Sequence, residues 1–470
     1  MRKIKFGTDG WRARIAEEFT FDNLRIIAQA VGDYLKNEGK AEQGVAVSYD
    51  TRFLSPEFAR SCAEVLAANG IPVYLSSSYT PTPVLSYAVK QRRLAGGIMI
   101  TASHNPSQYS GVKFKGDYGG SAMEAITRSI EKQLYRTPPA YFQNGIGGAI
   151  FEVDFFTDYL AHLQNFIRFD LISTFPGKIV LDSMGGAGAV FLSRLLDLGA
   201  VSYAEIDAGP DPLFHGKLPE PVLKNLSALS AAVREEKASL GLATDGDADR
   251  FGVLDENGEF VELHDLMPLL FEYLIESRGW SGNAVRTTSM HNTIDRVAAE
   301  HHREVTEVPV GFKNVCERML ENDVLIGGEE SGGFGYKNHI PERDGLLSAL
   351  LVLEMLAYKK TSIREMVREL RRKYGSFHYG RIDHYLDQHI LSQNLDRLRQ
   401  SPPQEIGGFK VERVSLIDGI KFYFTEKAWM LMRVSQTEPL GRVYVGADCQ
   451  ENVEKILKAG LRLLTGGASK

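Results

Sequence analysis

Three aspartates, Asp245, Asp247 and Asp249, alternate along one short segment with only Gly and Ala between them. Carboxylates this close repel one another, which raises their pKa values unless a cation lies among them. A ligand set made only of oxygen favours a hard ion, and Mg²⁺ is the most natural one in a cell. The segment therefore predicts a magnesium site. The alternative is a solvated acidic turn between two strands.

A calcium-binding loop is a second metal interpretation, because the three aspartates and Glu256 match four of its positions. The sixth position of such a loop must be Gly, and here it is Arg250. The loop also needs flanking helices, whereas residues 240–243 and 251–254 have the composition of strands. The sequence therefore disfavours a calcium module.

Ser103 is the residue that could complete the predicted magnesium site. An apolar run at 97–100 leads into Thr-Ala-Ser-His-Asn-Pro, and Asn-Pro ends the expected strand. The carboxyl end of a buried strand is where open α/β sheets place their chemistry. A phosphate on Ser103 would fill a coordination position that three carboxylates leave open. Lys113 and Lys115 could neutralise a transferring phosphoryl group, or could belong to a solvated strand face.

Two later segments offer groups that suit a phosphorylated sugar. Arg-Val-Ser-Gln-Thr-Glu-Pro at 433–439 offers a guanidinium, two hydroxyls and turn amides. That set suits a phosphate held away from the metal, although an ordinary turn has the same composition. Gly-Glu-Glu-Ser-Gly-Gly at 328–333 places two carboxylates and a hydroxyl on a flexible turn, which suits sugar hydroxyls.

Other glycine- and arginine-containing segments are less specific. Gly186 and Gly188 fit a dinucleotide-binding fingerprint, but its third glycine position is Phe191, so a tight strand-to-helix turn is favoured. Arg12 and Arg52 are expected at strand ends near the serine segment. A structural ion pair explains Arg52 at least as well as catalysis does.

The spacing of apolar residues predicts the elements that position these groups. Strands and helices alternate up to about residue 368, which indicates wound α/β layers, and the last part of the chain is typical of an α+β unit. The first strand is expected over residues 3–6, and a Pro/Gly-rich linker over 136–148. We expect four domains, at residues 1–140, 150–252, 253–368 and 375–470.

Composition narrows the function classes. With 54 Lys and Arg against 60 Asp and Glu, the net charge of −6 gives no electrostatic support for a nucleic-acid partner. The three cysteines have no metal-ligand spacing and fit a reducing compartment. The N-terminus does not resemble a signal peptide, and the longest apolar stretch, 346–356, is too short to cross a membrane. We expect a cytoplasmic enzyme that acts on a small molecule, and the sequence indicates no particular oligomeric state.

In content and order, the four segments resemble the signature loops of the α-D-phosphohexomutase superfamily, the phosphoglucomutases and phosphomannomutases. These are the catalytic serine loop at 101–106, the metal loop at 245–250, the sugar loop at 328–333 and the phosphate loop at 433–439. Gly-Thr-Asp-Gly-Trp-Arg at 7–12 also looks like the N-terminal signature of the family. The resemblance implies three similar mixed-sheet α/β domains and a C-terminal, TATA-binding-protein-like α+β domain around a central cleft.

The resemblance also implies residue roles. Ser103 would be carried as phosphoserine, and its phosphate would bind Mg²⁺ together with the three aspartates. Arg250 would contact the transferring phosphoryl group. The remaining matched positions are Arg12, His104 and Lys113 in the reaction centre, Glu329 and Ser331 at the sugar hydroxyls, and Arg433, Ser435, Gln436 and Thr437 at the non-reacting phosphate.

Some positions depart from the family pattern. Gln436 stands where the phosphate loop usually has Asn or a small residue, and Gly441 precedes Arg442 where a larger residue is common. The sugar loop ends in Gly333 and not in the His of the dual-specificity enzymes, which weighs against equal activity on mannose. Arg286 stands where several relatives carry Lys, so the sequence assigns it no role.

The function that the resemblance implies is that of a Mg²⁺-dependent phosphoglucomutase. It would interconvert glucose 1-phosphate and glucose 6-phosphate through a phosphoserine and glucose 1,6-bisphosphate, which is both intermediate and activator. Lys113 or His104 would carry the proton. The alternatives are a phosphomannomutase or dual-specificity phosphomannomutase/phosphoglucomutase, a phosphosugar phosphatase, and a catalytically silent sugar-phosphate sensor.

Overall fold

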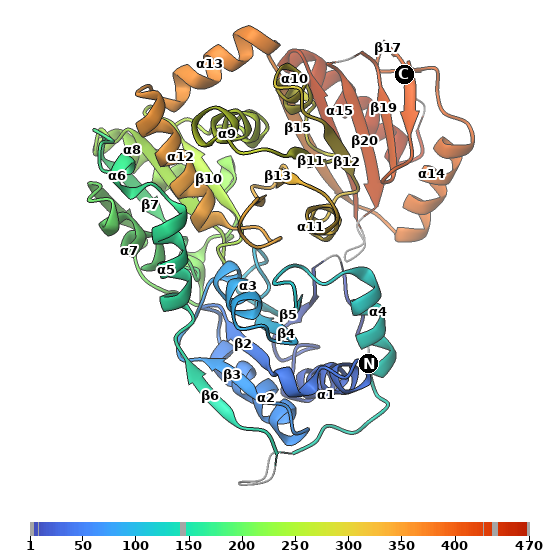
Figure 1. Cartoon of the computed structure of the whole chain (residues 1–470). Helices are drawn as coiled ribbons and strands as arrows, with labels where there is room; N and C mark the ends of the chain where they lie inside the picture. Colours follow the sequence, from blue (N-terminus) through green and yellow to red (C-terminus); the bar gives the residue numbers. More distant parts are fainter. Residues whose placement is uncertain (1–3, 8, 142–146, 426, 435–439, 468–470) are drawn as a thin grey trace.

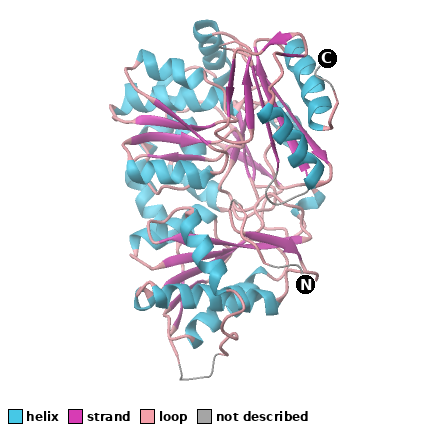
Figure 2. Cartoon of the chain, turned by 90° about the vertical axis from the view of Figure 1, so that its right-hand side faces the viewer, coloured by secondary structure: helices cyan, strands magenta, loops and turns pink. Residues whose placement is uncertain are grey.

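The computed structural model describes residues 4–7, 9–141, 147–425, 427–434 and 440–467. It contains four large sheets, and we call each sheet with its helices a unit, numbered first to fourth in chain order (Figure 1). The first unit forms one end of the molecule, and the other three are grouped beyond it (Figure 2). No helix in the described ranges is both long enough and apolar enough to span a bilayer.

The first sheet has the order β1-β5-β4-β2-β3-β6 and is mixed. β4 is parallel to β2, and β5 is antiparallel to β4 and β1. The strands are β1 (Trp11–Arg14), β2 (Val45–Tyr49), β3 (Val73–Ser76), β4 (Gly96–Ile100), β5 (Tyr109–Gly116) and β6 (Ile150–Val153). The helices are α1 (Phe21–Asn37), α2 (Ser55–Ala68), α3 (Thr82–Gln91) and α4 (Glu124–Gln133), with a 3₁₀ turn at Ala41–Gln43.

Two features of this unit differ from the expectation or extend it. The prediction of a strand over residues 3–6 is wrong, because residues 4–6 are irregular and the first strand among the described residues is β1. The apolar residues there, Ile4 and Phe6, are buried, but only the later segment pairs with β5. β6 follows the predicted linker and joins the edge of the first sheet beside β3.

The second sheet has the order β10-β9-β7-β8, in which only β10 is antiparallel to its neighbour. Its strands are β7 (Ile179–Asp182), β8 (Tyr203–Ile206), β9 (Leu240–Thr244) and β10 (Phe251–Leu254). The helices of this region are α5 (Phe156–Phe166), α6 (Phe169–Ile172), α7 (Phe191–Leu198) and α8 (Ser227–Glu235), with 3₁₀ turns at Phe214–Gly216 and Leu223–Asn225.

The third sheet has the order β12-β11-β13-β14, and β14 is its antiparallel strand. Its strands are β11 (Asn283–Thr287), β12 (Val305–Val308), β13 (Val324–Gly328) and β14 (Phe334–Tyr336). Its helices are α9 (Leu263–Arg278), α10 (Thr293–Glu300), α11 (Phe312–Glu321), α12 (Gly345–Lys359) and α13 (Ile363–Tyr374). The apolar stretch at 346–356 lies within α12, which is buried against elements of the second and third units.

The fourth sheet is antiparallel throughout, with the order β15-β21-β20-β19-β18. Its strands are β15 (His378–Tyr385), β18 (Arg413–Ser415), β19 (Ile420–Tyr423), β20 (Trp429–Val434) and β21 (Leu440–Ala447). α14 (Gln388–Gln400) and α15 (Gln450–Leu464) pack on it, and β16 (Glu405–Ile406) and β17 (Phe409–Lys410) form a separate hairpin. The chain therefore has three α/β units and a C-terminal α+β unit, as the sequence predicts.

Arg52 is a fully buried structural clamp behind the serine segment. Its Nε lies 3.0 Å from Asp50 Oδ2, and both side chains have no exposed area. Its two terminal nitrogens donate hydrogen bonds of 2.7–2.9 Å to the main-chain carbonyls of Ser103, Asn105, Pro106 and Tyr109. These contacts supply hydrogen-bond donors to the peptide oxygens of a tight loop, which have no partner on a neighbouring strand. Arg52 therefore shapes the loop and does not face a substrate.

We predict that Arg52→Leu destabilises the fold by about 3–5 kcal/mol, because it leaves Asp50 as an unpaired buried charge. Urea unfolding followed by the fluorescence of Trp11, in the first sheet, measures the change. Arg60→Leu is the matched control, since Arg60 forms an exposed pair with Glu152 and its loss should cost about 1 kcal/mol or less. Equal costs for the two variants would contradict the structural role.

Candidate active site

The backbone of the serine loop holds Ser103 in a strained conformation. Ser103 has φ +52°, in the left-handed region that residues other than Gly, Asn and Asp rarely adopt. Its N–H donates to Thr101 Oγ1 at 2.8 Å, and Thr101 donates in turn to Asp50 Oδ2 at 2.6 Å. Together with the Arg52 clamp, these bonds enforce the conformation. Such strain is characteristic of functional loops.

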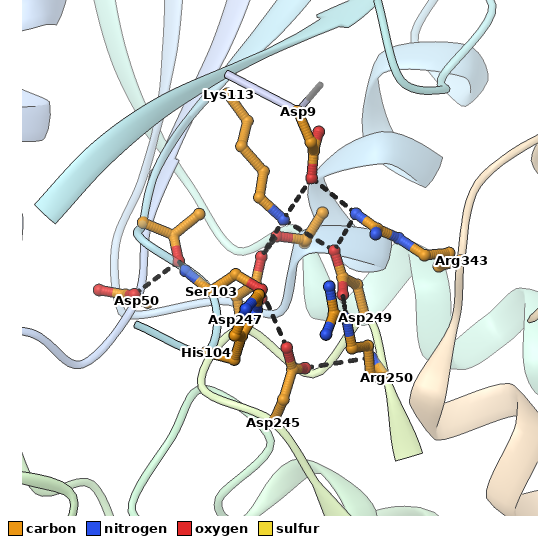
Figure 3. A network of polar contacts seen from close by, with 12 residues as sticks. Asp9, Asp50, Ser103, His104, Lys113, Asp245, Asp247, Asp249, Arg250 and Arg343 are labelled. Carbon is orange, nitrogen blue, oxygen red and sulfur yellow. Dashed lines mark hydrogen bonds and ion pairs between the residues drawn. The ribbon is translucent and has the colours of Figure 1, made fainter. Parts of the chain in front are cut away.

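The metal loop lies directly against the serine loop (Figure 3). Ser103 Oγ donates to Asp245 Oδ2 at 3.0 Å, although the two residues are 142 positions apart. Gly246 permits this approach, because a Cβ atom at that position would lie 2.4 Å from the carbonyl oxygen of Ser103. The structure thus brings together the two segments that the sequence singles out for chemistry.

The glycine-rich turn at 185–189 packs beneath the metal loop. A Cβ atom on Gly186 would lie 2.8 Å from the Gly246 backbone, and one on Gly188 would lie 2.3 Å from Thr244 Oγ1. Ala187 N also donates to the Gly246 carbonyl at 2.9 Å. These glycines serve close packing inside the second unit, as expected of a tight strand-to-helix turn.

The three aspartates form a compact and fully buried carboxylate cluster. One oxygen of each lies within 4.8 Å of the others. Burial, reinforced by Asp247 and Asp249, raises the pKa of Asp245 well above its usual value. Oδ1 of Asp247 and Oδ1 of Asp249 are buried without a hydrogen-bond partner among the described residues. Asp249 Oδ1 has only a distant ion-pair contact, with Arg250 Nε at 3.9 Å. Buried carboxylate oxygens without hydrogen-bond partners fit a hard divalent cation.

Lys113 provides positive charge to this cluster from β5. Its Nζ lies 2.7 Å from oxygens of Asp247 and Asp249, and 2.9 Å from Asp9. Although burial alone would lower its pKa, the three carboxylates raise the pKa of Lys113, so it stays an ammonium. The ammonium in turn holds the pKa of Asp247 below its usual value against the effect of burial. The interpretation of Lys113 as part of a solvated strand face is therefore wrong.

Arg343 and Asp9 belong to the same network, and sequence reasoning missed both. Arg343 Nη2 lies 2.6 Å from Asp9 Oδ2 and 2.6 Å from Asp249 Oδ2 (Figure 3). Lys115 is also buried, and its Nζ lies 2.6 Å from Glu342 Oε2, in the residue before Arg343. The available signal for Arg343 was Pro-Glu-Arg-Asp-Gly at 341–345, a charged turn directly before an apolar helix. For Asp9 it was the segment Gly-Thr-Asp-Gly-Trp-Arg at 7–12.

Three further predicted residues surround Ser103. His104 Nδ1 lies 3.4 Å from Ser103 Oγ, and burial, with nearby Arg250 and Arg12, lowers the pKa of His104 well below its usual value. Its imidazole is therefore neutral. Arg12 donates to Asn105 Oδ1 at 2.8 Å, and Arg250 N donates to Asp245 Oδ1 at 3.1 Å. The Nε of Arg250 is buried without a hydrogen-bond partner in the described part of the chain.

The sugar loop forms the turn between β13 and β14, which carries Glu329 and Ser331. Glu329 Oε1 accepts the N–H of Gly311 at 3.0 Å, and Oε2 lies 3.4 Å from Arg343 Nη1. Burial raises the pKa of Glu329. A Cβ atom on Gly333 would lie 2.1 Å from Arg343 Cδ, so a larger residue cannot stand there while Arg343 keeps its position.

Arg433 lies at the end of β20 and is 7% exposed. Its Nε is paired with Asp418 Oδ2 at 2.9 Å. The other phosphate-loop residues named from the sequence, Ser435, Gln436 and Thr437, lie outside the described residues.

Arg286 is held by Asp295 through Nε at 2.7 Å and Nη2 at 2.8 Å, so this guanidinium is engaged within its own unit.

Comparison with known proteins places this arrangement in a family. Three models of phosphoglucomutase/phosphomannomutase α/β/α domains match the chain: domain I over residues 3–139, domain II over 157–258 and domain III over 263–374. The chain belongs to the phosphoglucomutase/phosphomannomutase family. It is therefore a phosphohexomutase of the α-D-phosphohexomutase superfamily, whose members are isomerases that act by intramolecular phosphotransfer. The exact domain boundaries given above remain predictions.

Individual relatives of this phosphohexomutase carry different substrate names. A crystal structure from Thermus thermophilus, provisionally described as a phosphomannomutase, is 38% identical, covers 99% of both chains and has a TM-score of 0.87. A phosphoglucomutase/phosphomannomutase from Thermococcus kodakarensis is 29% identical over 98% of both chains. A Pyrococcus abyssi relative, provisionally described as a phosphoglucosamine mutase, is 30% identical over 99% of this chain and 98% of its own.

We predict that Gly246→Ala lowers kcat at least about tenfold, because the added methyl pushes the metal loop away from Ser103. The assay follows conversion of a hexose 1-phosphate to the 6-phosphate. Gly32→Ala in α1 is the control, since its Cβ meets no atom closer than 3.6 Å, and kcat should stay within about twofold. A Gly246→Ala enzyme that folds normally and keeps full kcat would contradict the need for close contact between the loops.

Proposed function

We propose that this phosphohexomutase is a Mg²⁺-dependent phosphoglucomutase that interconverts glucose 1-phosphate and glucose 6-phosphate. The observation that carries the proposal is the hydrogen bond from Ser103 Oγ to the buried carboxylate cluster, with Lys113 beside it. A hydroxyl nucleophile against a cation site is the arrangement that phosphoryl transfer needs.

Asp245, Asp247 and Asp249 would hold the Mg²⁺, together with an oxygen on Ser103. The oxygens of Asp247 and Asp249 that have no hydrogen-bond partner among the described residues, and the mutual distances of the three carboxylates, fit such an ion. When bound, Mg²⁺ supplies stabilisation of negative charge on the transferring phosphoryl group. Lys113, held as an ammonium, would add positive charge at the same place. Arg250 would offer its buried Nε, which has no hydrogen-bond partner among the described residues.

In the first transfer, a sugar hydroxyl attacks the phosphorus carried on Ser103. The bond from phosphorus to Ser103 Oγ breaks, and the new bond to the sugar oxygen gives glucose 1,6-bisphosphate. We assign His104 as the acceptor of the hydroxyl proton, because its Nδ1 lies 3.4 Å from Ser103 Oγ and burial, which lowers its pKa, keeps the imidazole neutral. In the second transfer, Ser103 takes the phosphoryl group from the other sugar position, and His104 returns the proton.

The remaining predicted residues would hold the sugar through this cycle. Glu329 and Ser331 would bind its hydroxyls, and the non-reacting phosphate would lie at Arg433 with Ser435, Gln436 and Thr437. Arg12 would contact the phosphoryl group beside Asn105. Glucose 1,6-bisphosphate would also act as the activator that reloads an unphosphorylated Ser103.

We predict that Ser103→Ala abolishes mutase turnover, by at least about 10³-fold in kcat, because the phosphoryl carrier is gone. The fold should survive, since the Arg52 clamp and the Ser103 N–H bond involve only the main chain at this position. A coupled assay for glucose 6-phosphate gives the rate, and circular dichroism reports the fold. Substantial turnover by this variant would refute the covalent role.

The alternative function is that of a phosphomannomutase, favoured by the 38% identical structure and by the mixed substrate names of the relatives.

We predict a higher kcat/KM for glucose 1-phosphate than for mannose 1-phosphate or N-acetylglucosamine 1-phosphate. The three substrates are compared with one enzyme preparation, and release of inorganic phosphate is measured in parallel to test for a phosphatase. A preference for mannose or N-acetylglucosamine would overturn the glucose assignment while leaving the mutase chemistry intact.

A further inference from the structure

Asp418 stands at the contact between the third and fourth units and has no role in the function proposed so far. It precedes β19 in the turn Asp-Gly, where Gly419 has φ +67° and its Cβ would lie 2.1 Å from the Met432 carbonyl. This turn therefore lies tightly against the β20 strand that carries Arg433. The side chain of Asp418 is 16% exposed and that of Arg433 is 8% exposed.

One oxygen of Asp418 receives two contacts from different units. Oδ2 lies 2.9 Å from Nε of Arg433, in the fourth unit. The same oxygen accepts the main-chain N–H of Val310, in the third unit, at 3.0 Å. Arg433 also forms a side-chain hydrogen bond with Tyr444. A guanidinium has five N–H donors, so it can keep these two contacts and still bind an anion through a terminal nitrogen.

The next peptide continues this connection to the sugar loop. Gly311, which follows Val310, donates its N–H to Glu329 Oε1 at 3.0 Å. Two consecutive main-chain amides thus hold the carboxylate beside Arg433 and the carboxylate proposed to bind sugar hydroxyls. The path Arg433–Asp418–Val310–Gly311–Glu329 is continuous in direct contacts.

We infer that Asp418 is the positioning residue for Arg433, and that it orients the guanidinium toward the non-reacting phosphate of a sugar phosphate at a fixed place relative to the sugar loop. This inference rests on the proposed phosphate-binding role of Arg433. A phosphate gripped in both half-reactions contributes uniform binding, so losing the orientation should raise KM and leave kcat nearly unchanged.

The test compares Asp418→Ala and Asp418→Asn with and without Arg433→Ala. Dissociation constants for glucose 6-phosphate are measured by calorimetry in the Ser103→Ala background, where no turnover occurs, and KM and kcat are measured with Ser103 present. Asp418→Ala should raise Kd and KM about tenfold, with kcat within about threefold. Asp418→Asn keeps an acceptor for Val310 but loses the charge beside Arg433, so it should raise Kd as well.

The decisive outcome is the dependence on Arg433. With Arg433→Ala already present, adding Asp418→Ala should change Kd by less than about twofold, because a positioning residue has nothing left to orient. An equal rise in Kd with and without Arg433→Ala would overturn the inference. So would an unchanged Kd in Asp418→Asn, which would limit Asp418 to its hydrogen bond with Val310.

Two controls separate positioning from general damage. Lys421→Met removes another contact between the same units, from Lys421 Nζ to the Thr288 carbonyl at 2.6 Å, without touching Arg433. Its effect on Kd should be the same with and without Arg433→Ala, and a dependence equal to that of Asp418→Ala would overturn the inference. Asp396→Asn, in an exposed pair within α14, should leave Kd unchanged, and a shift equal to that of Asp418→Asn would overturn a specific role for Asp418.

The outcome is distinguishable from failure of the proposed function. An unmodified chain without mutase activity would remove the function, while a Kd that depends on Asp418 and Arg433 together would still support the inference. If Asp418→Ala fails to fold, Asp418→Asn carries the same comparison, because it preserves the shape and the Val310 acceptor. A chain that binds no sugar phosphate at all would overturn both.

Discussion

The structure depends on the need to neutralise three carboxylates that are buried side by side. Asp245, Asp247 and Asp249 have no exposed area, and an unpaired buried charge costs several kcal/mol. The compensating charges come from other units: Lys113 from the first and Arg343 from the third. The proposed catalytic centre therefore also joins the first, second and third units through ion pairs.

This constraint accounts for two features of the serine and metal loops: the strained backbone of Ser103 and the close approach at Gly246. The strained backbone at Ser103 persists only because Arg52, Asp50 and Thr101 bind the surrounding peptide groups. Gly246 then lets the metal loop approach that backbone, so the hydroxyl meets the carboxylates. The fourth unit is joined to this centre more indirectly, through the peptide that links Asp418 to Glu329.

Much of the site follows from sequence because its parts are local. Strand-ending segments such as 101–106 and 245–250 carry their own turn chemistry, so each can be recognised from its residue types and spacing. Their meeting depends on how the first and second units pack, because β4 and β9 belong to different sheets. The pairing of Asp9 with Arg343 could not be predicted, because it depends on how separate units pack and not on local spacing. Lys113 illustrates the same limit: its strand pattern alone allowed a solvated face, and only the packed structure shows which carboxylates it meets.

The most direct test of the buried cation site is an anomalous diffraction map from crystals of the unmodified enzyme grown with Mn²⁺ in place of Mg²⁺. The account predicts one strong peak enclosed by oxygens of Asp245, Asp247 and Asp249, on the side that faces Ser103. The other group that could hold an ion among the described residues is Glu272, Glu276 and His301. A peak there, with none at the three aspartates of an active enzyme, would contradict the account.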